Sequence, residues 1–229
     1  MNLMQDVLAV RRDALVRSGL TTGFTPRETA LEIIEEIYSS GDFRPRSEVE
    51  KDPGLLQPIP CAVLHWKNRV LTLERQEKER SHSLHGRLVI WAGGHVDIED
   101  ARSSNSELLL SCLERELDEE IKLTRGAPEL QGLIFDGRSL HFAVVYDVPG
   151  EPPPGGVLEV SEEFRPGSRR SIRGSFVSLN ELEKRYDRLE TWSKLILSDV
   201  LMRTDVLRAH VPSGQLTIED ASNSAEIAG

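Results

Sequence analysis

The sequence predicts an α+β or α/β sandwich, and three observations support this prediction. Helical periodicity dominates residues 1–45, short apolar runs typical of strands follow, and a helical segment interrupts these runs before a final helix. Hydrophobic residues make up 38% of the 229 residues, which is enough for a sizeable core. No internal repeat is visible, and the length suits one domain with extensions or two small domains.

Two helices are expected ahead of the strands. In the first, apolar side chains recur at helical spacing from Met4 onward, and Gly19 would end the helix. The second begins at Thr25, which can cap it, with Pro26 at the first helical position and Glu28 completing a capping box. Its apolar stripe is Leu31, Ile34 and Ile37, and it closes at Gly41 and Pro45.

From Pro58 the pattern changes to that of β-strands. Two apolar runs, 59–66 and 69–73, are joined by a hairpin turn at Lys67-Asn68, and a third run, 87–92, leads into Gly93-Gly94. Loops are expected at 76–86, 95–105 and 149–174. The remaining elements are a helix at 106–123, strands at 130–135, 140–148 and 175–179, and a closing helical region capped by Asn180, with Leu189, Trp192, Leu195, Ile196 and Val200 on its apolar face.

The charge and cysteine content restrict the partners and the compartment. The formal net charge is −10, whereas a general nucleic-acid binder presents a basic face. Cys61 and Cys112 lie in apolar runs without Cys-x-x-Cys spacing, which predicts buried free thiols and a reducing cytoplasm. Charged residues interrupt the N-terminal apolar stretch, and no run reaches membrane-spanning length. We expect a soluble cytoplasmic protein that is neither a general nucleic-acid binder nor a membrane protein.

The helix expected at 106–123 carries the residues with the clearest chemistry. Its buried stripe repeats every three or four residues and consists of Leu110, Leu113, Leu117 and Ile121. Glu116, Glu119 and Glu120 project from a neighbouring face. Clustered carboxylates repel one another unless a cation neutralises them, and hard oxygen donors suit Mg²⁺ or Mn²⁺. A Glu-rich helix is also often just a solvated face, so the metal interpretation needs support from the surroundings.

That support comes from the strand ending in Gly93-Gly94, where backbone without side chains can approach an ion or a phosphate. The helix then reads Arg115-Glu116-Leu117-Asp118-Glu119-Glu120-Ile121-Lys122-Leu123. This run resembles the second half of the Nudix signature, G-x5-E-x7-R-E-U-x-E-E-x-G-U, in which U is a bulky aliphatic residue. Every defined position of that half matches except the late Gly, which is Lys122 here.

The first half of the signature departs from the pattern. Counting back from Arg115 places Glu107 at the first Glu but Ala101 at the signature Gly. Counting forward from Gly94 instead places Asp100 at the first Glu, and both alignments fit if the intervening loop carries an insertion. Asp100 and Glu107 are thus two candidates for one acidic position. Glu107 could alternatively complete a capping box for the helix.

Further segments resemble one branch of the family, the bacterial predicted phosphoesterases of Nudix type, whose substrates are poorly defined. These segments are 57–60, 73–75, 84–87, 93–97, 176–179 and 189–193, and the resemblance covers about residues 46–204. It implies an α+β fold, a Nudix-like α/β/α sandwich with a mixed sheet. The implied organisation is an N-terminal helical extension at 1–45, a Nudix domain at 46–207 and a flexible tail at 208–229.

The resemblance also implies a metal-dependent mechanism. Mg²⁺ or Mn²⁺ would be held by Glu116, Glu119 and Glu120, by the carbonyl of Gly94, and by whichever of Asp100 and Glu107 fills the first acidic position. Arg115 would orient Glu119. The base that removes a proton from the attacking water would be Glu116 or, from a later loop, Glu159, Glu162 or Glu163.

The implied activity is hydrolysis of a diphosphate linkage in a nucleoside diphosphate derivative or a related compound, so the partner would be a small phosphorylated substrate. Arg75 and Arg87 could bind an outer phosphate or form surface ion pairs, and His95 could contact substrate or only its own loop. The alternative function is a catalytically silent Nudix domain that binds a nucleotide-type ligand and regulates a partner. The sequence does not decide whether the protein is a monomer or a homodimer.

Overall fold

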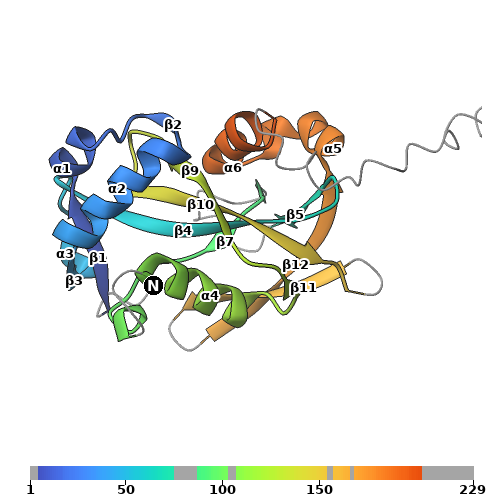
Figure 1. Cartoon of the computed structure of the whole chain (residues 1–229). Helices are drawn as coiled ribbons and strands as arrows, with labels where there is room; N and C mark the ends of the chain where they lie inside the picture. Colours follow the sequence, from blue (N-terminus) through green and yellow to red (C-terminus); the bar gives the residue numbers. More distant parts are fainter. Residues whose placement is uncertain (1–4, 75–86, 103–106, 154–156, 166–167, 203–229) are drawn as a thin grey trace, which may run out of the picture.

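A mixed sheet runs through the centre of the molecule (Figure 1) in the strand order β11-β12-β5-β4-β10-β9-β2. This computed structural model describes residues 5–74, 87–102, 107–153, 157–165 and 168–202, with 102, 157, 159–165 and 168–172 described by their backbone alone. The strands are β2 Gly23–Pro26, β4 Leu55–Trp66, β5 Arg69–Glu74, β9 Glu129–Phe135, β10 His141–Glu151, β11 Val157–Arg165 and β12 Ser168–Ser178. The pairing of β4 with β10 is parallel and the other pairings along this path are antiparallel, which confirms the predicted α+β fold with a mixed sheet.

Helices cover both faces of the sheet (Figure 1). Helix α4, Leu108–Glu120, lies on one face, and α5, Leu179–Lys184, lies on the other with α6, Thr191–Leu195, and its π-helical continuation Ile196–Leu201. Side chains that alternate along β4 supply the two cores. Leu56, Ala62 and Leu64 pack in the core that includes α4, and Ile59, Cys61 and Val63 pack in the core that includes α6.

The predicted helix from Met4 to Gly19 is wrong in its first half. Asp6–Arg11 is a strand, β1, and only Arg12–Arg17 is helical, α1. The residues from Asp6 to Ala9 pair with β3, Asp42–Pro45, and Val10 and Arg11 pair with β4. All four residues from Val7 to Val10 are buried. A strand buried on both faces is continuously apolar, so its sequence does not alternate and can be mistaken for a helix.

The second predicted helix is confirmed as α2, Arg27–Ser40, but its start and its apolar face differ from the prediction. Thr25 is held extended in β2 by pairing with β9, and no side chain makes a capping hydrogen bond. Leu31 is 50% exposed, and the buried face consists of Ala30, Ile33, Ile34 and Ile37. A short helix, α3, Arg46–Val49, follows β3.

The predicted loop at 149–174 is mostly strand. This segment contains the end of β10, all of β11 and most of β12. The strand expected at 175–179 is only the last part of β12. Because β11 lies at the edge of the sheet and its sequence is polar, the apolar alternation that identifies a buried strand is weak there. The backbone register pairs β11 with β12 antiparallel, with Glu162 opposite Arg170.

The predicted strand at 87–92 divides into two short strands. β6, Leu88–Val89, pairs with β5, and β7, Ala92–Gly93, pairs with β4. After a 3₁₀ turn at Asp100–Arg102 and α4, a further short strand, β8 Thr124–Arg125, pairs with the end of β10. The hairpin turn at Lys67-Asn68 is confirmed, with Lys67 at φ 54°.

Cys61 and Cys112 are free and buried, as predicted. No helix within the described ranges is both long enough and apolar enough to cross a bilayer. The domain boundaries near residues 45 and 207 stay predictions, and residues 208–229 lie outside the described part of the chain.

One buried carboxylate joins the C-terminal helices to the strand that leads into Gly93. Glu190, and not the predicted Asn180, caps α6, and it accepts hydrogen bonds from the backbone N–H of Trp192 at 2.9 Å and from Nε1 of Trp91 at 2.8 Å. The Ser193 hydroxyl donates to Glu190 at 2.6 Å and accepts from the backbone N–H of Ile90 at 3.1 Å. The position of the strand before the glycines therefore depends on Glu190.

Replacement of Glu190 by Ala should lower the free energy of unfolding by about 3 kcal/mol, because it removes a helix cap and leaves buried donors unsatisfied. Urea denaturation of the two proteins measures the difference. Glu183→Ala removes an exposed carboxylate from α5 and should change stability by less than about 0.5 kcal/mol. Equal effects of the two substitutions would contradict the role assigned to Glu190.

Candidate functional site

Two glycines bring the end of β7 against β4 and α4. A Cβ atom on Gly93 would lie 1.9 Å from the carbonyl oxygen of Pro60 in β4. A Cβ atom on Gly94 would lie 2.3 Å from Oε1 of Glu116. Any larger residue at position 94 would displace that carboxylate, so Gly94 is what allows Glu116 to contact the backbone of the loop.

Helix α4 packs against the sheet through one side and carries its carboxylates at the edge of that contact. The buried side consists of Leu108, Leu109, Cys112, Leu113 and Leu117, whereas Leu110 of the predicted stripe is only partly buried. The side chain of Glu116 is 15% exposed and that of Glu119 is 45% exposed. Glu120 is half-buried. Core packing thus fixes the helix so that Glu116 points toward the loop from Gly94 to Glu99, here called the glycine loop.

Arg115 joins that loop to α4. Its Nε and Nη2 atoms donate to the two carboxylate oxygens of Asp100 at 2.8 and 3.0 Å. Nη1 donates to Oε1 of Glu116 at 2.8 Å, and Nη2 also donates to the carbonyl oxygen of His95 at 3.1 Å. Glu119 lies farther away, 3.8 Å from Nη1. The nearest carboxylates of Arg115 are therefore those of Asp100 and Glu116.

The two candidates for the first acidic position lie in different places. Asp100 is 4% exposed, and its Oδ2 accepts a hydrogen bond from the backbone N–H of Asp97 at 2.9 Å. Glu107 is exposed at the residue before α4, makes no capping hydrogen bond, and lies about 13 Å along the helix axis from Glu116. The structure brings Asp100, and not Glu107, to Arg115.

Burial raises the pKa of Glu116 above its ordinary value of 4.5, and the negative charges of Glu119 and Asp100 raise it further. The positive charge of Arg115 and its hydrogen bond act in the opposite direction without reversing the shift. A carboxyl group with a raised pKa accepts a proton more readily than a solvated one. Glu116 therefore has the character expected of a group that either accepts protons or is neutralised by a bound cation.

The donor chemistry fits a hard divalent cation, although the ligands are not gathered into a closed set. Within the part of the chain that the structure describes, no three His, Cys, Asp or Glu side chains are grouped so that they could hold a metal ion. Glu116 and Glu119 nevertheless project from α4 beside the same guanidinium, and Gly94 leaves room for Glu116 at the loop. Carboxylate and carbonyl oxygens are the ligands that Mg²⁺ and Mn²⁺ prefer.

No family model matches the chain, but comparisons with curated proteins and solved structures find relatives. YmaB of Bacillus subtilis is 28% identical over 206 residues, which cover 85% of this chain and 96% of that protein. The crystal structure of Tm1382, assigned to the Nudix hydrolases, has a TM-score of 0.68 at 25% identity and covers 86% of this chain and 98% of its own. The chain belongs to the Nudix superfamily. A MutT protein from Bacillus halodurans is more distant, with a TM-score of 0.37 at 20% identity over 64% of this chain and 83% of its own.

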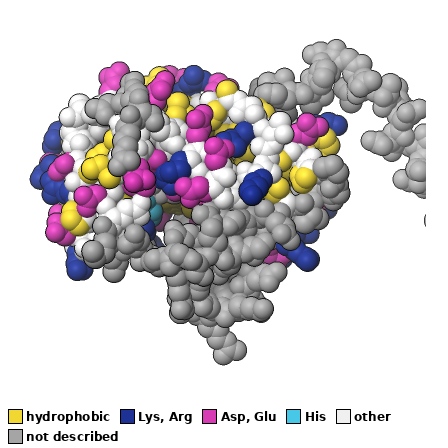
Figure 2. Space-filling view, turned by 90° about the horizontal axis from the view of Figure 1, so that it is seen from below, with side chains coloured by type: hydrophobic (Ala, Val, Ile, Leu, Met, Phe, Trp, Pro, Cys, Tyr) yellow, Lys and Arg dark blue, Asp and Glu magenta, His cyan; other side chains and the backbone are white. Residues whose placement is uncertain are grey.

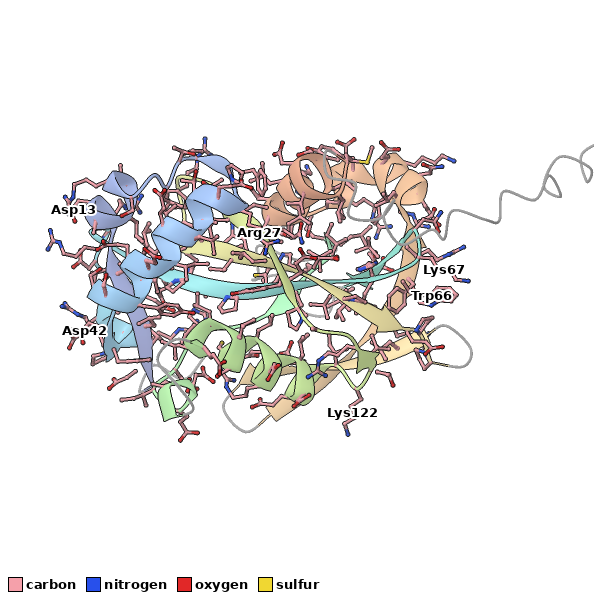
Figure 3. All side chains as sticks on the ribbon, viewed as in Figure 1. Asp13, Arg27, Asp42, Trp66, Lys67 and Lys122 are labelled. Atoms are coloured by element: carbon pink, nitrogen blue, oxygen red, sulfur yellow. The ribbon has the colours of Figure 1, made fainter. Side chains whose placement is uncertain are left out.

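The remaining predicted residues lie apart from α4 or outside the described residues. Arg87 donates from Nη1 to the backbone carbonyl of Asp187 at 2.7 Å, on the side of the C-terminal helices. Lys122, which replaces the late Gly of the Nudix signature, projects into solvent beyond α4 (Figure 3). Arg75 and the side chains of Glu159, Glu162 and Glu163 lie outside the described residues.

Three residues that the motif does not contain complete the surroundings of the glycine loop. The amide of Gln5 donates to Oδ2 of Asp97 at 2.6 Å, and Oδ1 of Asp97 accepts from the backbone N–H of Glu99 at 2.8 Å. His141 lies 3.2 Å from His95 between their Nε2 atoms. Gln5 and His141 are distant in sequence and show no local signal, whereas Asp97 could have been identified as a loop-forming residue because Asp commonly bonds backbone two residues ahead.

The raised pKa of Glu116 predicts how stability depends on pH in the metal-free protein. Between the ordinary pKa and the raised one, the folded state binds more protons than the unfolded state, so stability falls as pH rises through this window. In EDTA, the free energy of unfolding of wild type should therefore fall relative to that of Glu116→Gln as the pH rises above about 4.5. Denaturant titrations at several pH values measure this difference, and a difference independent of pH would contradict the prediction.

Proposed function

We propose that this protein is a Mg²⁺- or Mn²⁺-dependent hydrolase that cleaves a diphosphate linkage in a nucleoside diphosphate derivative or a related compound. The observation that carries the proposal is the contact between Gly94 and Glu116, on a helix that reads Arg115-Glu116-Leu117-Asp118-Glu119-Glu120. The similarity to Tm1382 supports the hydrolase class. A phosphorylated small molecule is the partner in this proposal, and homodimerisation and a cytoplasmic location stay predictions.

Glu116, Glu119 and Glu120, with the backbone carbonyl of Gly94, are the proposed metal ligands. A bound divalent ion supplies neutralisation of phosphate charge and a lower pKa for coordinated water. The carboxylates have the donor chemistry for this role, and their mutual repulsion is relieved when a cation binds. We assign Asp100 to the first acidic position of the Nudix signature because it binds Arg115 through both oxygens, and we leave Glu107 out of the ligand set.

The side chains near the ion would have two further roles, positioning of a ligand and removal of a proton from water. Arg115 holds Glu116 at 2.8 Å and is itself fixed by Asp100, so it acts as a positioning residue. Glu116, whose pKa is raised by burial, is the proposed general base, and Glu159, Glu162 and Glu163 of β11 are the alternatives. The partly buried loop at Gly94 would limit the water around the reacting phosphate, which strengthens charge interactions there.

Glu119→Gln and Glu120→Gln should each lower Mg²⁺-dependent release of phosphate products by about a hundredfold or more, because each removes a charged ligand. The fold should persist, since both side chains lie at least partly in solvent. Glu114→Gln is the matched control, since Glu114 is exposed on the same helix but points away from Glu116. Malachite-green detection of released phosphate, with a phosphatase added to process nucleotide products, measures all three variants.

The substrates for this assay are nucleoside triphosphates, dinucleoside polyphosphates, nucleotide sugars, dinucleotide cofactors and prenyl diphosphates, each with Mg²⁺ or Mn²⁺. EDTA should abolish turnover, and excess Mg²⁺ should restore it. Full activity in both Glu119→Gln and Glu120→Gln would contradict the site assignment. Tight binding of one compound without turnover of any would favour the regulatory alternative, a silent domain that controls a partner.

A further inference from the structure

His141, the first residue of β10, contacts the glycine loop through its ring. Its Nε2 atom lies 3.2 Å from Nε2 of His95, and the two rings meet edge to face with their centroids 5.1 Å apart. His95 directly follows Gly94, whose backbone carbonyl is a proposed metal ligand. The two histidines are 46 residues apart in the sequence, so this contact joins β10 to the loop from a distant part of the chain.

The contact is a hydrogen bond between two neutral rings. Burial is the main cause that lowers the pKa of His95 and of His141 below the ordinary value of 6.5, so both rings are neutral at pH 7. A neutral imidazole has one N–H and one bare nitrogen, and one Nε2 can therefore donate to the other. The bond holds the His95 ring against the start of β10.

A turn before β10 fixes the other side of the His141 ring. Nδ1 of His141 lies 3.2 Å from the hydroxyl oxygen of Ser139, and that oxygen also accepts from the backbone N–H of His141 at 3.0 Å. Oδ1 of Asp136 accepts from the backbone N–H of Ser139 at 2.7 Å and from that of Arg138 at 2.9 Å. An aspartate that bonds backbone two residues ahead stabilises a turn. The His141 ring therefore cannot rotate without breaking hydrogen bonds at both of its nitrogens.

From His95 the contacts continue to the proposed general base. Nη2 of Arg115 donates to the backbone carbonyl of His95 at 3.1 Å, and Nη1 donates to Oε1 of Glu116 at 2.8 Å. Sγ of Cys112 lies 3.4 Å from the same carbonyl oxygen. A shift of His95 would displace this carbonyl, and with it the guanidinium that holds Glu116 beside Gly94.

The partners of His141 favour a role in holding the loop over a direct contact with substrate. Both ring nitrogens lie at hydrogen-bond distance from protein atoms, in His95 and in Ser139. Figure 2, which views the molecule from below, on the side of α4, shows a histidine side chain at the edge of a hollow. The histidines thus lie next to the space that a ligand of this face would occupy.

We infer that His141 is a positioning residue of the candidate site: through the ring of His95 it holds the glycine loop in the shape in which Arg115 binds Glu116. The effect on hydrolysis rests on the proposed function, whereas the effect on the loop does not. His141 lies outside the Nudix signature, so β10 supplies a part of the site that the signature does not contain.

The first test measures backbone hydrogen exchange by mass spectrometry on the full chain in EDTA, and it needs neither metal nor substrate. The peptide of interest spans the glycine loop, where the N–H groups of Asp97 and Glu99 donate to carboxylates. His141→Leu should speed exchange there about tenfold, the order expected for loss of one hydrogen bond. His141→Gln should stay within about twofold of wild type, because its amide can still bond to His95.

A control variant and a second test variant separate the loop from general stability. Val145 is buried on the same side of β10 and packs in the core that includes α6, so Val145→Ala leaves a cavity away from the loop. It should leave exchange in the loop peptide as in wild type. Ser139→Ala removes the hydroxyl that fixes the His141 ring and should speed loop exchange as His141→Leu does.

A double-mutant cycle tests whether His141 acts through His95. His95→Ala should speed exchange of the loop, and the addition of His141→Leu should produce no further increase. Independent effects that multiply in the double variant would overturn the inference. Exchange at the wild-type rate in His141→Leu would also overturn it, as would equally fast exchange in His141→Gln and His141→Leu.

Mn²⁺ binding and hydrolysis give the functional readout. His141→Leu should weaken Mn²⁺ affinity, measured by electron paramagnetic resonance of the free ion, by about tenfold. It should lower kcat by a similar factor and leave KM within about twofold of wild type, because the loop holds metal ligands and not the distant part of the substrate. Faster loop exchange with the Mn²⁺ affinity and kcat of wild type would contradict the positioning role.

The failure of this inference is distinguishable from failure of the proposed function. If loop exchange depends on His141 while wild type neither binds Mn²⁺ nor hydrolyses any substrate, the link from His141 to the loop stands and the proposed function fails. If hydrolysis requires Glu119 while His141→Leu leaves loop exchange and Mn²⁺ affinity unchanged, the inference about His141 alone is wrong.

Discussion

A single guanidinium group holds the candidate site together. Arg115 donates hydrogen bonds to both oxygens of the buried Asp100, to the carbonyl of His95 and to the carboxylate of Glu116. A buried carboxylate needs such a partner, because loss of solvent penalises an uncompensated charge. Asp100 in turn accepts from the backbone N–H of Asp97, so the shape of the loop, the position of α4 and the orientation of Glu116 depend on one another.

Strand β4 supplies the frame on which this network is built. The glycine strand β7 pairs with its middle, at Cys61 and Ala62, and the N-terminal strand β1 pairs with its beginning, at Leu55 and Leu56. The N-terminal segment therefore reaches the site: the backbone N–H of Leu8 donates to the carbonyl of Val96, and the Gln5 amide donates to Asp97. Residues before α4 thus form one side of the loop that follows Gly94.

The elements that could be predicted are those whose signal is local. The spacing of Leu109, Leu113 and Leu117 on α4 follows helical geometry, and Lys67-Asn68 marks a turn between two apolar runs. The elements that were missed depend on distant partners. The run Val7–Val10 is a strand because it pairs with β3 and then with β4. The polar hairpin of β11 and β12 joins the sheet because β12 pairs with β5. Periodicity within one segment cannot report such neighbours.

The sequence by itself determined the chemical character of the candidate site. The spacing of Glu116, Glu119 and Glu120 sets their common side of the helix, and Gly93-Gly94 marks backbone that an ion or a phosphate can approach. Tertiary structure decided which acidic residue pairs with Arg115, and it placed His141 beside His95. The physical reason is that helical spacing is fixed by local backbone geometry, whereas contacts across the chain depend on the register of β1, β4 and β10, which is set by packing of the whole sheet.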